Sequence, residues 1–249
     1  MRILLISDLH ANWPALEAIS EPHDLCLCLG DLVDYGCEPA PVIDWVRERA
    51  AVCVRGNHDH MVAQNVQTAG VTGYRYLSGA TRPISRERLT DSDRRYLAGL
   101  PLTRFLTLDG KRFLLVHATP RDALDEYAPG DEDLWRRRVE NVGVDVVCVG
   151  HTHQIFDMTV GGVRVINPGS VGLSRDGDPR ASYAVWEDGK VTFKRVEYDV
   201  ERAVRSVETS ALPDQAKQML RRLYRGGSLT NGTGKNHTAL ALQPAAARV

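Results

Sequence analysis

Short apolar runs alternate with helical patterns in the first 56 residues. Three of the runs have the length and nearly continuous apolar character of buried strands: 2–7, 24–30 and 51–56. The two segments between them, 13–20 and 40–50, have the spacing of amphipathic helices. This β-α-β-α-β order predicts a mostly parallel sheet covered by helices.

The pattern changes after a polar, glycine-rich stretch at 65–85 and a predicted helix at 91–100. Apolar segments now flank short turn sequences, which is typical of β-hairpins. The turns are Asp109-Gly110, Gly161-Gly162 and Asp188-Gly189. We therefore expect a second sheet that is richer in antiparallel strands, followed by helical structure at 199–225. The tail at 226–249 has no clear periodicity, and we expect it to be mobile or to pack on a neighbour.

Composition and charge narrow the function classes. The chain has 31 basic and 32 acidic residues among 249, so no overall basic field favours nucleic acid or an anionic membrane as a partner. The first apolar run, Ile3 to Ile6, is too short for a signal peptide, and no later run approaches the ~18 residues of a membrane span. We expect a cytoplasmic protein. Its five cysteines lack framework or zinc-site spacing, which predicts reduced thiols.

Metal-competent side chains follow the predicted strands at the points where the strands end. They are Asp8 and His10; Asp31 and Asp34; Asn57, His58 and Asp59; His117; and His151 and His153. Taken singly, an aspartate after a strand is usually a turn or capping residue, and a histidine is usually a satisfied polar group. As a set they predict one site at the carboxyl ends of the strands, where α/β folds place ligands.

The chemistry of this set indicates divalent transition metals. Carboxylates and imidazoles without thiolates suit first-row divalent ions better than calcium or structural zinc. A catalytic ion takes about four protein ligands at most, so a set of at least seven candidate ligands among these residues implies two ions. Two ions that share a carboxylate can hold a hydroxide and clamp an in-line displacement at phosphorus.

The order of these motifs resembles the calcineurin-like metallophosphoesterase superfamily, in particular its small bacterial and archaeal phosphodiesterase-type members. The motifs are Asp8-x-His10, Gly30-Asp31, Gly56-Asn57-His58-Asp59, His117 and Gly150-His151-x-His153, and the sequence NPGSVG at 167–172 is also similar. The resemblance implies an α/β fold, an αββα sandwich of two mixed sheets flanked by helices, in a single domain over residues 1–225.

The resemblance also implies a role for each motif residue. Asp8, His10 and His153 would bind one metal ion, Asn57, His117 and His151 the other, and Asp31 would bridge them. His58 would be the catalytic histidine, and Asp34 would orient it and keep it charged. Mn²⁺, Fe²⁺, Zn²⁺, Ni²⁺ and Co²⁺ all accept this ligand set.

We expect a hydrolase that depends on two metals and acts on a small phosphodiester, including nucleotide-derived ones, by attack of a metal-bridging hydroxide. A phosphomonoesterase, a dinucleoside polyphosphate hydrolase and a catalytically silent metal-binding scaffold are the alternatives. Tyr35 stands where the Ser/Thr protein phosphatases of the superfamily carry a phosphate-gripping arginine, which disfavours that activity. Candidate substrate contacts are Arg55, Arg121, Tyr127 and Trp135. The sequence does not predict the oligomeric state.

Overall fold

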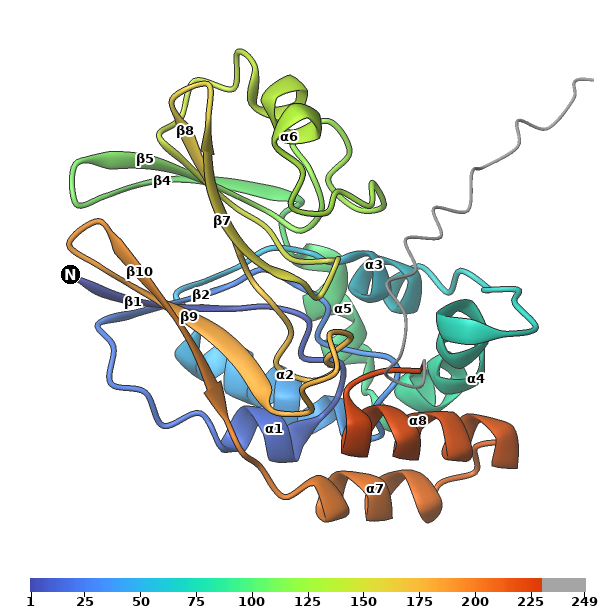
Figure 1. Ribbon diagram of the computed structural model, residues 1–249. Helices are drawn as coiled ribbons and strands as arrows, with labels where there is room; N and C mark the ends of the chain where they lie inside the picture. Colours follow the sequence, from blue (N-terminus) through green and yellow to red (C-terminus); the bar gives the residue numbers. More distant parts are fainter. Residues whose placement is uncertain (230–249) are drawn as a thin grey trace, which may run out of the picture.

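The computed structural model describes residues 1–229, and its strands form two five-stranded sheets packed face to face (Figure 1). Sheet A has the order β10-β9-β1-β2-β3. Its parallel part, β1 to β3, is the predicted β-α-β-α-β unit, and β9 joins β1 in antiparallel register. The strands of sheet A are β1 Arg2–Ile6, β2 Leu25–Cys28, β3 Val52–Cys53, β9 Ala181–Glu187 and β10 Lys190–Val196.

Sheet B has the order β4-β5-β6-β8-β7, in which β5, β6 and β8 are parallel to one another and the two edge strands are antiparallel. All three predicted hairpins form: β4–β5 and β7–β8 in this sheet and β9–β10 in sheet A. The bounds are β4 Thr103–Leu108, β5 Lys111–Val116, β6 Val146–Cys148, β7 Ile155–Val160 and β8 Val163–Pro168.

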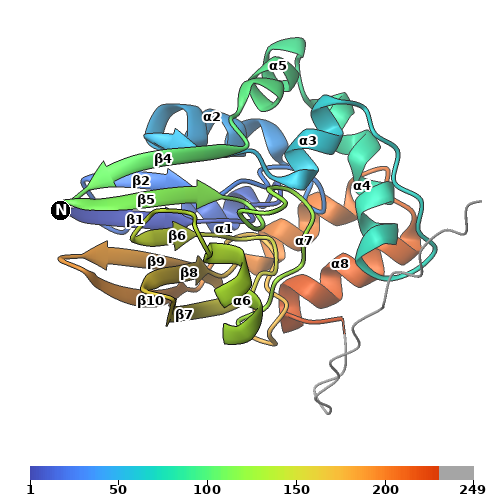
Figure 2. The same cartoon turned by 90° about the horizontal axis from the view of Figure 1, so that it is seen from above.

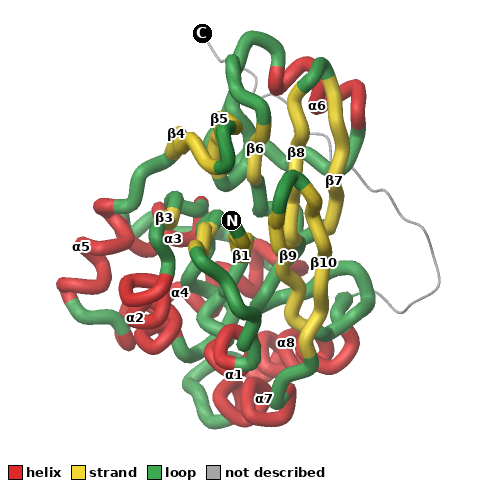
Figure 3. The backbone as a smooth tube through the Cα atoms, turned by 90° about the vertical axis from the view of Figure 1, so that its left-hand side faces the viewer, coloured by secondary structure: helices red, strands yellow, loops and turns green. Residues whose placement is uncertain are grey.

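Apolar side chains from the facing sides of the two sheets form the central core. Leu5 and Leu27 of sheet A and Phe113 and Leu115 of sheet B are all fully buried there. Both outer faces are also apolar, because the central strands are covered on both sides. Helices α1 and α2 cover sheet A and α6 covers sheet B, which gives the expected αββα sandwich (Figure 3).

Helices α1, α2, α5, α7 and α8 lie where the sequence predicts helical structure, whereas α3, α4 and α6 occupy stretches for which it predicts none. Asn12 caps α1 through the Ala15 amide, and Thr90 forms a capping box at the start of α5. The bounds are α1 Trp13–Glu17, α2 Pro39–Arg49, α3 Asn57–Ala63, α4 Gly73–Arg88, α5 Asp91–Gly99, α6 Glu132–Val139, α7 Val200–Glu208 and α8 Asp214–Gly226. No helix within residues 1–229 is long and apolar enough to cross a membrane.

Of the three helices that the sequence does not predict, α4 is the longest, and it occupies much of the stretch that the sequence presents as polar and glycine-rich. Its buried face combines Leu77 and Ile84 with the polar residues Ser78, Thr81 and Arg82. A hydrophobic pattern cannot reveal such a helix, because its polar residues pack inward. The sequence-predicted tail at 226–249 lies outside the described residues from position 230 onward.

Candidate metal centre

The parallel strands of both sheets end at the same edge of the sandwich, beside α3 and α4 (Figure 2). The loops after β1, β2, β3, β5 and β6 meet there. They bring their polar residues to one site, as the strand-end pattern predicts. All nine of the predicted site residues lie within it: Asp8, His10, Asp31, Asp34, Asn57, His58, His117, His151 and His153.

One group of ligand atoms consists of Asp8, His10 and His153, all of them buried. The Nε2 atoms of the two histidines face each other at 3.1 Å. Asp8 Oδ1 is 3.2 Å from His153 Nε2 and has no hydrogen-bond partner. Three donor atoms therefore converge on one point.

A second group consists of Asp31, His117 and His151. Asp31 Oδ2 lies 3.2 Å from His117 Nε2 and 3.8 Å from His10 Nε2, so this carboxylate oxygen stands between the two groups. Asn57 Oδ1 is 3.2 Å from His117 Nε2 and can add a neutral oxygen ligand. His151 and His153 lie in separate groups, and Thr152 between them turns aside to bond with Asn167.

The hydrogen bonds of the imidazoles suit metal binding. The Nδ1 atoms of His10, His117 and His153 lie next to the backbone carbonyls of Val33, Leu29 and Leu173, at 3.0 Å and 2.7 Å for the first two. A carbonyl can only accept, so Nδ1 carries the proton and Nε2 presents a lone pair to the site. Two lone pairs 3.1 Å apart repel each other unless a cation lies between them. The residues therefore fit two divalent ions.

Burial and charge set the protonation of these groups. Burial lowers the pKa of His10 and of His153, and it lowers the pKa of His151 to about 3, with the charge of His117 adding to the effect. Burial opposes the charged form of His117 too, yet the Asp31 carboxylate raises its pKa to about 10. The Asp31 carboxylate thus favours a positive charge next to His117 Nε2, which either a proton on that nitrogen or a bound metal ion can supply.

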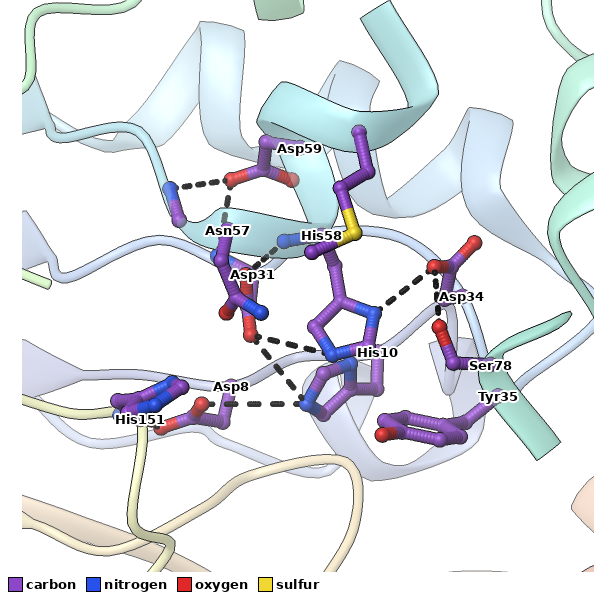
Figure 4. A network of polar contacts seen from close by, with 12 residues as sticks. Asp8, His10, Asp31, Asp34, Tyr35, Asn57, His58, Asp59, Ser78 and His151 are labelled. Atoms are coloured by element: carbon purple, nitrogen blue, oxygen red, sulfur yellow. Dashed lines mark hydrogen bonds and ion pairs between the residues drawn. The ribbon is translucent and has the colours of Figure 1, made fainter. Parts of the chain in front are cut away.

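His58 lies beside the two groups and is held by a carboxylate (Figure 4). Its Nδ1 is 2.8 Å from Asp34 Oδ2, and its Nε2 is 3.9 Å from Asp31 Oδ2. Burial opposes the imidazolium, but the charges of Asp31 and Asp34 raise the pKa of His58 above its usual value. His58 therefore lies between two carboxylates, with Nδ1 toward Asp34 and Nε2 toward the Asp31 carboxylate that stands between the two groups.

Residues of helix α4 hold Asp34 in place. Arg82 Nε donates to Asp34 Oδ2 at 3.1 Å, and the Arg82 Nη2 atom bonds the same oxygen. The hydroxyl groups of Thr81 and Ser85 accept from the amides of Tyr35 and Asp34. The orientation of His58 thus depends on a helix that sequence patterning does not predict.

Asp59 holds the loop that carries Asp31 through hydrogen bonds to its backbone. Its carboxylate accepts from the amides of Asp31, Leu32 and Gly56 at 2.8–2.9 Å. Gly56 has no room for a side chain, because a Cβ there would lie 2.0 Å from Asp31 Oδ1. The Asp31 loop and the start of α3 are therefore packed backbone against backbone.

Several site residues adopt left-handed backbone conformations that non-glycine residues rarely take. They are Asp8, His10, Asp31, Asp34, Tyr35, His151 and His153, with φ between 46° and 64°. Such conformations cost of order 1–3 kcal/mol each and cluster at functional sites. Five of these residues, Asp8, His10, Asp31, His151 and His153, supply ligand atoms to the two groups.

A cavity of about 760 Å³ opens onto the two groups. Its lining includes His58, His151 and His153 together with Tyr74 and Arg175. This size lies within the range of small-molecule sites.

The four sequence-predicted substrate contacts have different positions. Trp135 is fully buried and its indole donates to Pro129, while Arg55 bonds the backbone of Ala98. Arg121 is exposed and pairs with Glu126. Tyr127 remains near the site, with its ring 6.1 Å from that of His151.

Arg82, Ser78 and Arg175 contact or line the site although sequence reasoning does not single them out. Arg82 and Ser78 are spaced i, i+4 on a helix, which is a weak signal. Nothing in the sequence pattern indicates a role for Arg175, because its position in the cavity depends on the path of the chain after β8.

Comparisons with known proteins agree with this geometry. The model for the calcineurin-like phosphoesterase superfamily domain matches residues 1–188. An uncharacterized protein of Methanocaldococcus jannaschii is 31% identical over 239 residues, which cover 85% of this chain and 94% of the relative. A metallophosphoesterase from Sphaerobacter thermophilus is 31% identical, with a TM-score of 0.75 and coverage of 91% of this chain and 99% of that one. A hypothetical protein from Pyrococcus horikoshii OT3 shares the fold, with a TM-score of 0.78, 22% identity and coverage of 88% and 97%.

Proposed function

Because the chain belongs to the calcineurin-like phosphoesterase superfamily, we propose that it is a phosphodiesterase that hydrolyses a small phosphodiester with two divalent ions. The observation that carries the proposal is the pair of ligand groups, which meet at Asp31 and share one cavity with His58. The ligands would be Asp8, His10 and His153 for one ion, Asn57, His117 and His151 for the other, and Asp31 for both.

When bound, the two ions supply Lewis acidity and an activated water for in-line displacement at phosphorus. The chain's own residues hold the donors in place before the metals arrive: backbone carbonyls orient three of the histidines, and Asp59 holds the loop of Asp31. This preorganisation is what a dinuclear site requires of the protein.

His58 is the proposed acid. Its Nδ1–H donates to Asp34, which leaves Nε2 facing the cavity. As the bond between phosphorus and the leaving oxygen breaks, the Nε2 proton passes to that oxygen, so that an alcohol leaves in place of an alkoxide. Asp34 and Arg82 keep the ring in the orientation that this transfer needs.

The cavity walls favour a diester. Besides its polar groups, the cavity is lined by Met61, Val66, Ala69 and Tyr74. These side chains offer apolar contact to a second ester substituent, which a monoester lacks. A phosphomonoesterase is the second candidate, because the Arg175 guanidinium in the same cavity suits a dianionic phosphate.

The test is a rate comparison on protein stripped of metal and reloaded with Mn²⁺, with bis-p-nitrophenyl phosphate and p-nitrophenyl phosphate assayed side by side. We expect faster hydrolysis of the diester. A faster monoester rate would replace the phosphodiesterase by a phosphatase. No hydrolysis of either ester with both ions bound would favour the scaffold.

A further inference from the structure

Arg175 is a half-buried arginine in the cavity that has no anionic partner among residues 1–229. Its guanidinium carbon lies 4.0 Å from the centre of the Tyr74 ring and 6.0 Å from that of Tyr35. Its Nε atom is buried and makes no hydrogen bond. A buried charge without a partner is costly, so a residue of this kind points to an absent ligand.

Other arginines that stack on aromatic rings in the described part of the chain are satisfied differently. Arg47 stacks over Tyr96 and pairs with Asp93 at 2.8 Å. Arg164 lies over Trp186 and pairs with Asp157 at 2.6 Å. Arg49 stacks over Trp45 and is exposed to water. Stacking alone therefore does not account for Arg175, which has neither a carboxylate nor full access to water.

The segment that carries Arg175 is fixed on both sides. The carbonyl of Leu173 accepts from Nδ1 of His153, one of the proposed metal ligands. On the other side, Asp176 accepts from Ser174 Oγ at 2.7 Å and also pairs with Arg195. The segment on both sides of Arg175 is therefore held in place, two residues from a contact to a proposed metal ligand, and the Tyr74 ring lies against the guanidinium.

The charges around the guanidinium select an anion as its ligand. Within the cavity lining, Arg75 and Arg175 are cationic, and Asp125 is the carboxylate outside the two ligand groups. Burial raises the pKa of Asp125, and the charge of Asp122 adds to this effect. A guanidinium fork matches two phosphate oxygens with two parallel hydrogen bonds.

We propose that Arg175, supported by the Tyr74 ring, binds the non-bridging oxygens of the substrate's reacting phosphoryl group. Arg175 shares its cavity with His58, Asn57 and Asp31, so we expect it to contact the phosphoryl group that reacts there and not a phosphate elsewhere on the substrate. This inference rests on the proposed phosphoesterase function. It makes Arg175 a binding residue that lies outside the sequence motifs of the site.

The test uses inorganic phosphate as the probe and the full-length, Mn²⁺-loaded protein. Arg175→Met keeps most of the side-chain length but loses the charge and the fork, and Arg175→Lys keeps the charge alone. We expect Arg175→Met to weaken competitive inhibition by phosphate and to lower kcat/KM by roughly 10–100-fold. Arg175→Lys should recover part of both. Arg49→Met is the matched control, a ring-stacked arginine outside the cavity, and should behave like the wild type.

A second measurement does not depend on a variant or on turnover. Phenylglyoxal modifies accessible arginines, and mass spectrometry locates the modified residues. Phosphate should protect Arg175 in the wild type and leave Arg49 unprotected. A wild-type inhibition constant in Arg175→Met, or equal modification of Arg175 with and without phosphate, would overturn the inference. If the wild type binds metal and hydrolyses neither ester, the proposed function fails, while the protection experiment still decides whether Arg175 binds phosphate.

Discussion

His58 is oriented by Asp34 and takes no part in either group of ligand atoms. His58→Ala should therefore retain both metal ions while turnover falls by roughly 10²–10⁴-fold, the usual contribution of acid-base catalysis. Metal analysis and kcat on the same preparation check this prediction. His23→Ala, a change at an exposed histidine, is the control. Unchanged turnover in His58→Ala would remove this residue from the mechanism.

Asp31 and Asp8 offer a matched pair of carboxylates. Asp31 Oδ2 approaches histidines of both groups, whereas Asp8 Oδ1 belongs to one. Asp31→Asn should weaken binding of both ions, and Asp8→Asn should weaken mainly one. The number of Mn²⁺ ions bound per chain distinguishes them. Loss of a single ion in Asp31→Asn would contradict the bridging role.

Single residues differ in how far the sequence predicts their roles. The convergence of the proposed ligands on one site could be predicted because each lies in a loop that follows a buried strand, and parallel strands end at a common edge. Arg82 and Arg175 could not, because their positions depend on how distant segments pack. The left-handed conformations at Asp8, Asp31 and His151 are also invisible in the sequence, since these residue types are common in ordinary backbone.

At the scale of elements, the side chain of Glu21 forms hydrogen bonds with residues of three strands of sheet A and is only 6% exposed. It accepts from Arg2 of β1, Tyr183 of β9 and Lys194 of β10. Burial opposes the carboxylate, but the bonds from Lys194, Arg2 and Tyr183 lower the pKa of Glu21 from 4.5 to about 2.

The sign of the pH effect follows from this lowered pKa. The ionised carboxylate stabilises the folded state above pH 4.5, and the contribution is lost as the pH falls toward 2. The free energy of unfolding should decrease in this window by up to about 1.4 kcal/mol per pH unit on account of Glu21. Urea unfolding at pH 6, 4 and 3 measures the slope. Glu21→Gln should flatten it, and an equal slope in the variant would assign the effect to other groups.

Elements with a clear apolar period were predictable, and those shaped by polar contacts were not. The strands β1 and β2 and the helices α2 and α5 lie within a residue or two of their predicted bounds. Helix α4 was missed because it buries Ser78, Thr81 and Arg82 against the loop of Asp34. Strand β3 is shorter than predicted, as Arg55 leaves the sheet to bond with Pro101.

At the scale of the whole molecule, both proposed ions connect the two sheets. Asp8 and His10 follow β1 of sheet A, and His153 follows β6 of sheet B; the second group is divided in the same way. Removing the ions with EDTA should therefore abolish hydrolysis and also lower the Tm, because ligands that bind only the folded state stabilise it. Calorimetry before and after reloading with Mn²⁺ measures the shift. An unchanged Tm after verified loss of metal would exclude this cross-linking role.

The division of ligands between the sheets also sets an order of events during folding. His10 and His153 are 143 residues apart in the chain and come into contact only when sheet A and sheet B have docked. A partly folded chain with a single sheet holds fragments of each ligand group and has little affinity for an ion. Metal capture is then the final step of refolding, and the time course of Mn²⁺ uptake reports when the two halves of the sandwich have closed on each other.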